Sequence, residues 1–381
     1  MQKVRVGLIG YKFMGKAHSH AFFDVGKFFP LKVIPELKVI CGRNLDGVKQ
    51  AAERYGWETY ETDWRRLVKR DDIDLIDIVT PNNVHKEIVI EAARNGKHIL
   101  CEKPLAMNLR EAKEMVKAVE RAKVIHMVCF NYRKVPAIAL IKQMIKDGKL
   151  GRIYHWRAVY LQDWIVDPNF PLVWRLTKNV CGSGVLGDLC SHIIDLSRYL
   201  IGEIAEVCGM WETFIKQRPL PSEMSGLSAR GSKKKGKVDV DDATIFLVKF
   251  KNGAIGSFEA TRFATGHKNG EIIEINGSKG SVIFNMERMN ELQYYSREDE
   301  KNLQGWRTIQ VTESFHPYMS AWWPPGHIIG YEHTFIHLIY DLLNAIAENK
   351  LPEPNFYDGL KCQEVMERVV ESIKTKKWVK I

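Results

Sequence analysis

The feature that most constrains the fold is a regular alternation of short apolar runs and amphipathic helical segments over the first 130 residues. Strands are expected at residues 4–9, 37–41, 74–80, 97–101 and 124–130, with helices at 15–25, 49–55, 84–95 and 108–122. Strands that alternate with helices of this length form parallel βαβ units with right-handed crossovers. The sequence therefore predicts an N-terminal α/β domain with a doubly wound parallel sheet at residues 1–130.

The pattern changes after residue 130. Helices are expected at 136–147, 187–200, 331–348 and 358–375, and strands at 152–161, 205–213, 243–250, 254–260, 271–276, 281–285, 291–296 and 306–311. Closely spaced strands with Gly, Asn and Asp between them are typical of an antiparallel sheet. We therefore predict a C-terminal α+β domain, residues 131–381, with a large, mostly antiparallel open sheet.

The positive charge of the chain is concentrated in one segment. Lys and Arg exceed Asp and Glu by ten over 381 residues, and residues 230–237 alone supply five basic residues and no acidic one. Glycine and serine space these charges, which predicts a solvated loop. Residues 228–238 contain no aromatic side chain that could stack on bases, so nucleic acid is not an expected partner.

The cysteines and the N-terminal sequence indicate in which cellular compartment the protein is expected. The seven cysteines form no C-x-x-C pair, and the N-terminus lacks the pattern of a signal peptide. A cytoplasmic protein with reduced thiols is expected. No apolar run approaches the length of a membrane span, so no membrane partner is expected. His333 and His337 have helical spacing without the H-E-x-x-H pattern, so no metal site is predicted.

A glycine turn follows the first strand. Gly10 and Gly15 occupy the first and third positions of G-x-G-x-x-G, whereas Lys12 occupies the middle position. Such a turn, between a strand and a helix, places helix N–H groups against a pyrophosphate. Lys12 either contacts the pyrophosphate directly or stands where the backbone tolerates a side chain. The residues predicted to bind the dinucleotide here are Gly10, Lys12, Phe13, Met14 and Gly15.

The end of the second expected strand does not decide between NAD and NADP. The Asp or Glu that would bind a ribose 2′-hydroxyl is missing from residues 41–44. Arg43 could accept a 2′-phosphate or stack on adenine, or it could be solvated. Both cofactors therefore remain open.

Two further segments follow expected strands of the first domain. Ligands of doubly wound sheets bind beyond the carboxyl ends of the strands. A lysine at such an end, here Lys103, can stabilise a developing alkoxide. The cofactor-binding candidates in these segments are Thr80, Pro81, Asn82, His85, Glu102 and Lys103. Asn82 and His85 could equally line the substrate cleft. His18 and His20, in the first expected helix, are interpreted as structural or interfacial.

Asp188 and His192 stand four residues apart in an expected helix, so both project from one face. Histidine is suited to accept a hydroxyl proton near neutral pH, and a nearby carboxylate can orient it. Asp195 lies near the same face. Substrate-binding candidates are Tyr132, Gln162, Asp163, Trp164, Trp174, Arg175, Asp188 and His192. The two tryptophans could stack on sugar rings or be ordinary core aromatics.

Taken together, these segments resemble the Gfo/Idh/MocA oxidoreductases, which include glucose–fructose oxidoreductase and inositol dehydrogenase. The resemblance covers nearly the whole chain and rests on residues 7–15, 80–85, 102–104, 131–133, 188–195, 358–359 and 378–379. It implies a Rossmann domain, a second domain whose open sheet makes a homo-oligomer (dimer or tetramer), and a catalytic trio of Lys103, Asp188 and His192. Lys12 and Cys190 depart from glycines of the family pattern.

The resemblance also implies a reaction. Residues 240–243, 259–262 and 322–327 look like a subgroup that acts on pyranose-type sugars and includes levoglucosan dehydrogenase. The expected activity is NAD(P)-dependent oxidation of a secondary hydroxyl to a ketone, with His192 taking the proton, Lys103 stabilising the oxygen and Asp188 positioning His192. Two alternatives stay open, namely a cyclitol dehydrogenase and a non-catalytic dinucleotide-binding regulator.

Overall fold

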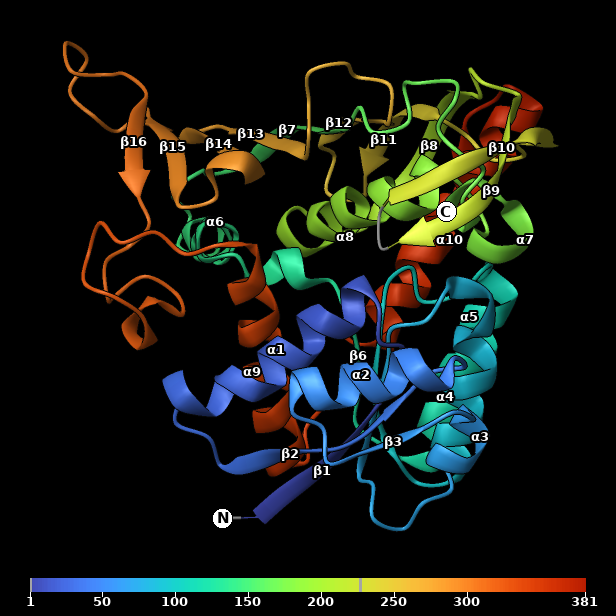
Figure 1. The fold of residues 1–381 in the computed structure, drawn as a ribbon. Helices are drawn as coiled ribbons and strands as arrows, with labels where there is room; N and C mark the ends of the chain where they lie inside the picture. The colour runs from blue at the N-terminus through green and yellow to red at the C-terminus, as the bar shows by residue number, and fades with distance from the viewer. Residues whose placement is uncertain (1, 226–227) are drawn as a thin grey trace. The chain divides into compact units, whose positions relative to one another are not determined.

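The computed structural model describes the backbone of residues 2–225 and 228–381. Side chains are described for residues 2–222 and 231–381. Two compact units make up the chain (Figure 1). The first unit is built from the residues up to 131 and from 330–363; the second contains 132–224, 228–329 and 364–381. The chain thus returns to the first unit after residue 329, a return that the sequence pattern does not predict.

The first unit contains the predicted doubly wound parallel sheet. Its strands are β1 (Gln2–Ile9), β2 (Val33–Cys41), β3 (Thr59–Glu61), β4 (Leu75–Ile78), β5 (His98–Cys101) and β6 (His126–Val128). They are ordered β3-β2-β1-β4-β5-β6, and every neighbouring pair is parallel. Consecutive residues of β1 and β4 are fully buried, as expected for strands covered by helices on both faces.

Helices cover both faces of this sheet. They are α1 (Phe13–Phe28), α2 (Leu45–Tyr55), α3 (Trp64–Leu67), α4 (His85–Arg94), α5 (Leu109–Ala122), α9 (Tyr331–Glu348) and the first part of α10 (Phe356–Thr375). α1 packs against α9, whereas α4 packs against α5. Asn108 caps α5 by accepting a 3.0 Å hydrogen bond from the Glu111 N–H, a role for which asparagine is well suited.

The second unit contains the large sheet. Its strands are β7 (Ile153–Leu161), β8 (Ile204–Glu212), β11 (Ala243–Phe250), β12 (Ile255–Thr261), β13 (Gly270–Gly277), β14 (Gly280–Asn285), β15 (Glu291–Ser296), β16 (Arg307–Gln310) and β17 (Val379–Lys380). They are ordered β16-β15-β14-β13-β7-β12-β11-β8-β17. β12 and β7 run parallel, and the other recorded pairs are antiparallel, so the mostly antiparallel sheet is confirmed.

One face of this sheet is covered by helices and the other carries exposed apolar side chains. The helices of the second unit are α6 (Pro136–Lys146), α7 (Lys178–Cys181) and α8 (Ser191–Leu200), of which α6 and α8 pack on the sheet (Figure 1). Along β11, Phe246 and Val248 are buried, whereas the alternating Ile245 and Leu247 are exposed. The strand period of two therefore separates a core face from an apolar outer face.

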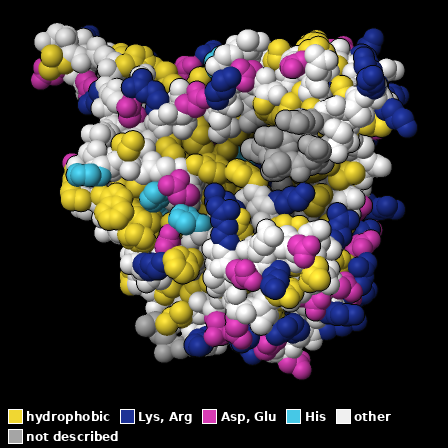
Figure 2. All heavy atoms as spheres, in the orientation of Figure 1, with side chains coloured by type: hydrophobic (Ala, Val, Ile, Leu, Met, Phe, Trp, Pro, Cys, Tyr) yellow, Lys and Arg dark blue, Asp and Glu magenta, His cyan; other side chains and the backbone are white. Residues whose placement is uncertain are grey.

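The expectation of a loop at residues 230–237 is wrong, because these residues belong to strand β10 (Ser228–Lys237), which pairs with β9 (Gln217–Ser225). Two glycines allow this strand to pack closely: an added Cβ would lie 2.7 Å from Pro219 at Gly231, and 2.6 Å from Leu172 at Gly236. The described lysines of β10 are exposed, and Figure 2 shows Lys and Arg side chains gathered at the upper right, where β10 lies in Figure 1. Lysines on a short, surface ribbon also discourage edge-to-edge pairing.

Two chain-wide features complete the fold. None of the seven cysteines, all of which are described, forms a disulfide. Among the described residues, no helix combines the length and the apolar character needed to cross a bilayer.

Candidate active site

The glycine turn of the first unit has the shape that a bound pyrophosphate requires. Gly10 has φ of +116°, a conformation that favours glycine, and an added Cβ at Gly15 would lie 2.3 Å from the Gly10 carbonyl oxygen. α1 begins at Phe13, and the side chain of its N-cap residue, Lys12, makes no capping hydrogen bond. The first N–H groups of α1 therefore remain available for an anion, and these residues fit a dinucleotide.

The side chains around this turn differ in exposure. Lys12 and Phe13 are exposed, and Met14 is half-buried. Lys12 thus stands at the surface where the G-x-G-x-x-G pattern has its middle glycine, so the tight turn tolerates its side chain. A direct contact of Lys12 with the pyrophosphate stays a prediction.

Tyr11 packs across the end of β2, which the sequence analysis missed. An added Cβ would lie 2.2 Å from the Tyr11 ring at Gly42 and 2.7 Å from its hydroxyl oxygen at Gly47. These two glycines therefore make room for the tyrosine. Arg43, the next residue after Gly42, is exposed. Gly42 and Gly47, on either side of the residues expected to contact the ribose, were the sequence signal that a large side chain packs there.

The segment after β4 is held by a buried histidine. Nδ1 of His85 lies 3.2 Å from the Pro104 carbonyl oxygen and 3.3 Å from that of Leu105, while Nε2 lies 3.0 Å from the Thr80 carbonyl oxygen. Burial lowers the pKa of His85 and favours the neutral ring. The ring thus lies between the loops after β4 and β5, and in its neutral form its single N–H donates to one of them. Cofactor contacts of Thr80, Pro81, His85 and Asn82, which lies in the 3₁₀ turn η1 (Asn82–Val84), stay predictions.

Lys103 follows β5 at the carboxyl edge of the parallel sheet. Its side chain is half-buried, and its backbone N–H donates to Glu102 Oε2 over 3.1 Å. The peptide bond between Lys103 and Pro104 is cis. Glu102 is buried and also contacts His18 of α1 at 3.0 Å. The predicted lysine therefore lies where ligands of a doubly wound sheet bind.

In the second unit, His192 packs against two tyrosines. Its ring stacks on that of Tyr132, with centroids 4.2 Å apart and planes 20° apart, and lies 6.0 Å from that of Tyr160. The two tyrosine hydroxyls are 2.9 Å apart. Burial raises the pKa of Tyr132, so its hydroxyl stays protonated and can serve as a hydrogen-bond donor. Two of the predicted site residues, Tyr132 and His192, are thus brought together.

Asp188 lies in a turn of π-helix, η4 (Leu186–Cys190), rather than in the predicted α-helix; α8 begins only at Ser191. Its Oδ2 accepts a 2.5 Å hydrogen bond from Arg262, which is 1% exposed, and lies 4.0 Å from Nε of Arg175. π-turns within helices are common at functional sites. The expected role of Asp188 in orienting His192 stays a prediction, and Arg262 is a partner that the sequence analysis did not name as a site residue.

A chain of polar contacts joins further predicted substrate residues. Tyr160 donates to the Asn269 side-chain oxygen at 2.9 Å, and the Gln162 amide donates to the same oxygen at 3.0 Å. The Trp164 indole N–H in turn donates to Gln162 at 2.9 Å. The Arg262 guanidinium lies 5.2 Å from the centroid of the Trp164 ring. These contacts therefore connect Tyr160, beside His192, with Arg262, which binds Asp188.

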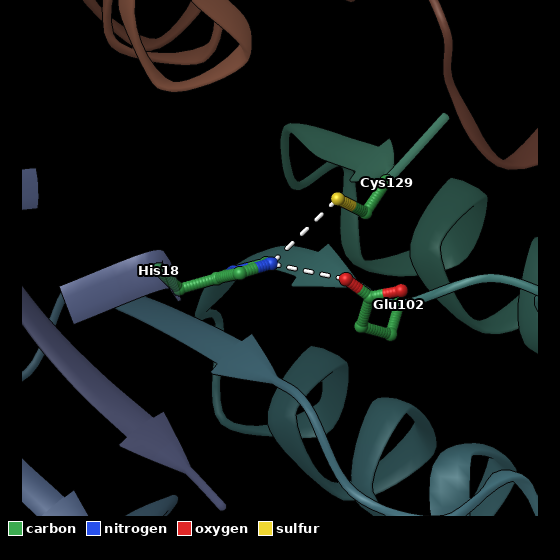
Figure 3. A group of neighbouring side chains, drawn as sticks. All are labelled: His18, Glu102 and Cys129. Atoms are coloured by element: carbon green, nitrogen blue, oxygen red, sulfur yellow. Dashed lines mark hydrogen bonds and ion pairs between the residues drawn. The ribbon is translucent and has the colours of Figure 1, made fainter. Parts of the chain in front are cut away.

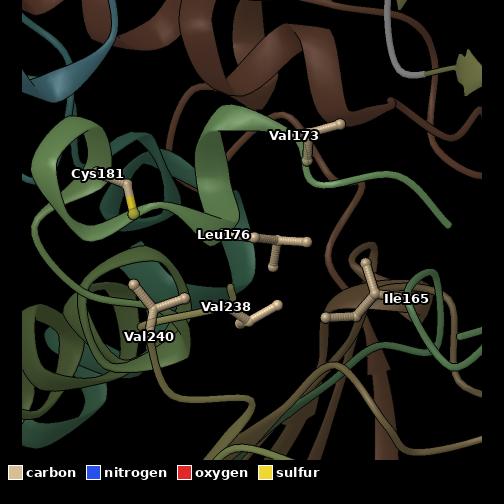
Figure 4. Close-up of a cluster of buried hydrophobic side chains, with 6 residues drawn as sticks. All are labelled: Ile165, Val173, Leu176, Cys181, Val238 and Val240. Carbon is tan, nitrogen blue, oxygen red and sulfur yellow. The ribbon is translucent and has the colours of Figure 1, made fainter. Parts of the chain in front are cut away.

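An apolar cluster supports both tryptophans. It consists of Ile165, Val173, Leu176, Cys181, Val238 and Val240 (Figure 4). Trp164 and Trp174 pack against it while remaining partly exposed, and the Arg175 guanidinium lies 4.4 Å from the Trp174 ring centroid. Each tryptophan is thus anchored by the core and retains exposed ring surface.

Two acidic residues named by the sequence analysis have other partners. Asp163 accepts from Lys268 at 2.8 Å and from the Gly266 N–H at 3.0 Å, and the Lys268 hydrogen bond lowers the pKa of Asp163. Asp195 is fully buried and makes a two-pronged ion pair with Arg133 at 2.5 and 2.7 Å. A structural role therefore accounts for Asp195, whereas substrate contact by Asp163 stays a prediction.

Comparison with known families decides the identity of the fold. The family model described as "Oxidoreductase family, NAD-binding Rossmann fold" matches residues 4–130, and the "GFO/IDH/MocA C-terminal domain" matches residues 138–283. The chain belongs to the Gfo/Idh/MocA oxidoreductases. It is accordingly an NAD(P)-dependent oxidoreductase, as its motifs predict.

Individual members of the Gfo/Idh/MocA family are similar over the full length. Levoglucosan dehydrogenase from Pseudarthrobacter phenanthrenivorans is 45% identical, with 100% of this chain and 99% of that protein covered. A solved structure of a levoglucosan dehydrogenase in complex with NADH and levoglucosan is 45% identical over 100% of this chain and 99% of that chain, with a TM-score of 0.95. A structure of an oxidoreductase domain protein from Kribbella flavida is 51% identical over all of both chains, with a TM-score of 0.96. Myo-inositol 2-dehydrogenase from Thermotoga maritima is 30% identical over 74% of this chain and 75% of its own length.

Within this Gfo/Idh/MocA chain, the predicted residues fall into a cofactor group and a substrate group. Residues 10–15, 43, 80–85 and 102–103 lie at the carboxyl edge of the parallel sheet in the first unit. Residues 132, 162–164, 174–175, 188 and 192 belong to the second unit. The contacts described above add residues 18, 160, 262 and 269, whose partners are far away in sequence.

Proposed function

We propose that this enzyme oxidises a secondary hydroxyl of a cyclic sugar of the levoglucosan type to a ketone. Its full-length similarity to levoglucosan dehydrogenase carries the proposal. A cyclitol is the second candidate substrate, because myo-inositol 2-dehydrogenase is also similar over three quarters of the chain. Both substrate classes present a ring carbon that bears hydrogen and a hydroxyl group.

The glycine turn and the strand-end segments would hold the dinucleotide. Gly10 and Gly15 provide close backbone approach, the N-terminus of α1 faces the pyrophosphate, and Lys12 adds positive charge beside it. When bound, the nicotinamide ring supplies a hydride acceptor. β2 is followed by Gly42 and Arg43 and not by a carboxylate that would bind the ribose 2′-hydroxyl. The absorbance screen described below therefore tests both NAD and NADP.

Each proposed catalytic side chain has one task. Lys103 donates a hydrogen bond to the substrate oxygen and stabilises the charge that develops there. His192 accepts the proton of the hydroxyl group, and its stacking on Tyr132 fixes the plane of its ring. Asp188, held by Arg262, is assigned the positioning of His192.

Side chains of the second unit would bind the rest of the sugar. The exposed surfaces of Trp164 and Trp174 suit the apolar face of a sugar ring, and Gln162 and Arg175 suit its hydroxyl groups. We also assign Tyr132 and Asp163 to this group. The proposal thus assigns cofactor binding to the domain of residues 1–130, to whose unit residues 330–363 return, and substrate binding and oligomerisation to the rest of residues 131–381.

We further propose a homo-oligomer, a dimer or tetramer, formed through the outer face of the large sheet. Met210, Ile245, Leu247 and Ile255 are 64%, 43%, 50% and 55% exposed. The strand register places Met210 opposite Ile245. Exposed large apolar side chains gathered on one face of a sheet are typical of an interaction surface. A cytoplasmic location belongs to the same proposal, since seven cysteines without a disulfide are typical of a reducing compartment.

An absorbance screen tests the substrate and the cofactor together. Purified enzyme is offered NAD or NADP with levoglucosan, glucose, myo-inositol or scyllo-inositol, and NADH or NADPH formation is followed at 340 nm. We expect turnover with levoglucosan and NAD, and weaker turnover with the inositols. Faster turnover with an inositol would favour the second candidate, and no turnover with any pair would count against both.

The proposed catalytic roles are tested by Lys103→Ala and His192→Asn. We expect each to lower kcat roughly 10²–10⁴-fold, the usual contribution of a positioned proton donor or acceptor. NADH affinity, measured by fluorescence, should remain near that of the wild type. Full turnover by Lys103→Ala, or an unchanged pH–rate profile for His192→Asn, would refute the corresponding role.

A further inference from the structure

A buried histidine in the first unit lies between two carboxylates. His18 of α1 is 0% exposed, with Nδ1 2.8 Å from Oδ2 of Asp77 in β4 and Nε2 3.0 Å from Oε1 of Glu102 after β5. Figure 3 shows its ring directed at Glu102 and Cys129. The phosphate-binding helix is thereby joined to the ends of two central strands. None of the roles proposed above uses His18, Asp77 or Cys129.

The charges of the cluster fit a protonated imidazole. Burial disfavours the cation, but Asp77 and Cys129, through charge and hydrogen bonding, together raise the pKa of His18 well above its usual range, while burial raises the pKa of Asp77. Burial also opposes ionisation of Glu102, yet its hydrogen bond to His18 lowers the pKa of Glu102. An imidazolium donates from both ring nitrogens, so one ring fixes both carboxylates.

Glu102 transmits this constraint to the catalytic lysine. Its Oε1 contacts His18, and its Oε2 accepts from the Lys103 backbone N–H at 3.1 Å. The following residues, Pro104 and Leu105, are held through their carbonyl groups by His85. The loop that carries Lys103 is therefore held on one side by Glu102 and the His18 cluster, and on the other it lies against the buried His85 ring.

A metal ion is an alternative occupant of the cluster. The ligand atoms of His18, Glu102 and Cys129 lie within 4.8 Å of one another. A ligand histidine must be unprotonated and a ligand cysteine must be a thiolate. Here His18 is hydrogen-bonded to a carboxylate through each ring nitrogen. Burial also raises the pKa of Cys129 to about 12, so its thiol stays protonated. We therefore interpret the group as a hydrogen-bonded network.

We propose that His18 is a positioning residue for Lys103: through Glu102 it fixes the loop from which the lysine projects. The inference rests on the proposed function only for the role of Lys103. Because α1 also carries the glycine turn at its N-terminus, one helix positions both the pyrophosphate and the lysine loop. Small displacements of a catalytic group are costly to turnover even when ligands still bind.

The first test compares His18→Gln with His126→Gln. His126 is also buried in the first unit, but its Nδ1 accepts from the Phe356 N–H, away from the cluster. We expect His18→Gln to lower kcat on the order of 10–100-fold, as for a misplaced catalytic group, with little change in sugar KM or NADH affinity. His126→Gln should keep the wild-type kcat. Wild-type kcat for folded His18→Gln would overturn the inference.

A double-variant cycle keeps the test informative if His18→Gln folds poorly. Glu102→Gln retains the shape of the side chain and removes the charge that pairs with His18. If His18 acts on Lys103 only through Glu102, each single variant lowers kcat. The kcat of the double variant then equals that of the less active single variant. Losses that multiply would overturn the inference. So would one equivalent of metal in the wild type that is absent from His18→Gln.

A readout that needs no turnover separates this inference from the proposed function. Acetic anhydride labels lysine amines, and peptide mass spectrometry can follow Lys103 against the exposed Lys350 in the same NADH-bound sample. We expect the ratio of the two rates to change in His18→Gln and to stay unchanged in His126→Gln. If the wild type oxidises no sugar, the proposed function fails, and the labelling ratio alone decides the inference: an unchanged ratio overturns it.

Discussion

Arg262 donates to Asp188 over 2.5 Å although the two residues lie 74 positions apart, and the guanidinium is almost fully buried. The carboxylate expected to serve His192 is therefore held by a strand-end arginine. The same guanidinium lies 5.2 Å from the centre of the Trp164 ring. One residue thus supports a proposed catalytic group and a proposed sugar-binding ring.

Removal of this arginine should impair catalysis, and because the side chain is fully buried it should also lower stability. A hydrogen bond to a charged group contributes about 1.5–3 kcal/mol, which corresponds to roughly a 10–100-fold fall in kcat/KM for Arg262→Ala. Arg262→Lys should retain part of the activity because it keeps the charge and loses the planar fork. Steady-state kinetics on the substrate found by the screen measure both.

Arg288 is the matched control for Arg262, because its ion pair with Glu291 is exposed. Exposed pairs contribute about 0–1 kcal/mol, so Arg288→Ala should leave kcat/KM near the wild-type value. Equal losses in Arg262→Ala and Arg288→Ala would contradict a specific role for the buried pair.

Gly15→Ala should weaken cofactor binding. The added methyl would lie 2.3 Å from the Gly10 carbonyl oxygen, so the turn must shift. We expect a loss of about 1–3 kcal/mol in the free energy of unfolding, as for other overpacked sites. A tenfold or greater rise in the Kd for NADH, about 1.4 kcal/mol, should accompany it. Fluorescence titration and thermal melts measure the two quantities.

Gly305→Ala is the control for that variant, because an added Cβ there meets nothing within 4 Å. Its stability should stay within about 0.5 kcal/mol of the wild type. Wild-type NADH affinity in Gly15→Ala would mean that the turn does not closely approach the dinucleotide.

Acidification should destabilise the protein through His126. Burial lowers the pKa of this histidine from 6.5 to about 4 in the folded state. The unfolded state therefore binds the proton first, so stability is retained above pH 6.5 and is lost as the pH falls toward about 4. The full loss from this group is about 3 kcal/mol. His126→Gln should lose less stability than the wild type over this range, which urea titrations at several pH values can measure. Parallel acid curves for the two proteins would contradict the assignment.

Charge placed on the outer face of the large sheet should dissociate the proposed oligomer. Leu247→Glu puts a carboxylate among exposed apolar side chains of β8, β11 and β12, and its desolvation in an interface is unfavourable. Light scattering coupled to gel filtration should show a smaller particle. Leu303→Glu, which changes an exposed leucine outside that sheet face, should leave the mass unchanged. A wild-type mass for Leu247→Glu would place the interface elsewhere or show a monomer.

Local patterns predicted the architecture well. The parallel sheet of the first unit follows from apolar runs and helix caps such as Asn108, which act over a few residues. The β10 ribbon escaped prediction because its lysines and glycines are typical of a loop. Its strand form depends on the close packing of Gly231 and Gly236 against Pro219, Leu172 and Leu220, which no local pattern records.

The candidate site divides in the same way. The glycine turn and Lys103 were predictable, since each is a short motif beside a strand end. The contact of His18 with Glu102 spans 84 positions, and that of Arg262 with Asp188 spans 74. Such pairs follow from tertiary packing alone. A single sequence therefore identified the groups proposed for chemistry and missed the groups that hold them.

The return of α9 to the first unit has a consequence for the order in which the protein is made. Phe335 of α9 lies against the His18 ring, and Tyr340 against Phe29. During synthesis, α1 leaves the ribosome hundreds of residues before the helix that covers it. Until α9 is synthesised, the face of α1 that packs against it stays exposed. A fragment that ends near residue 130 would expose this face permanently.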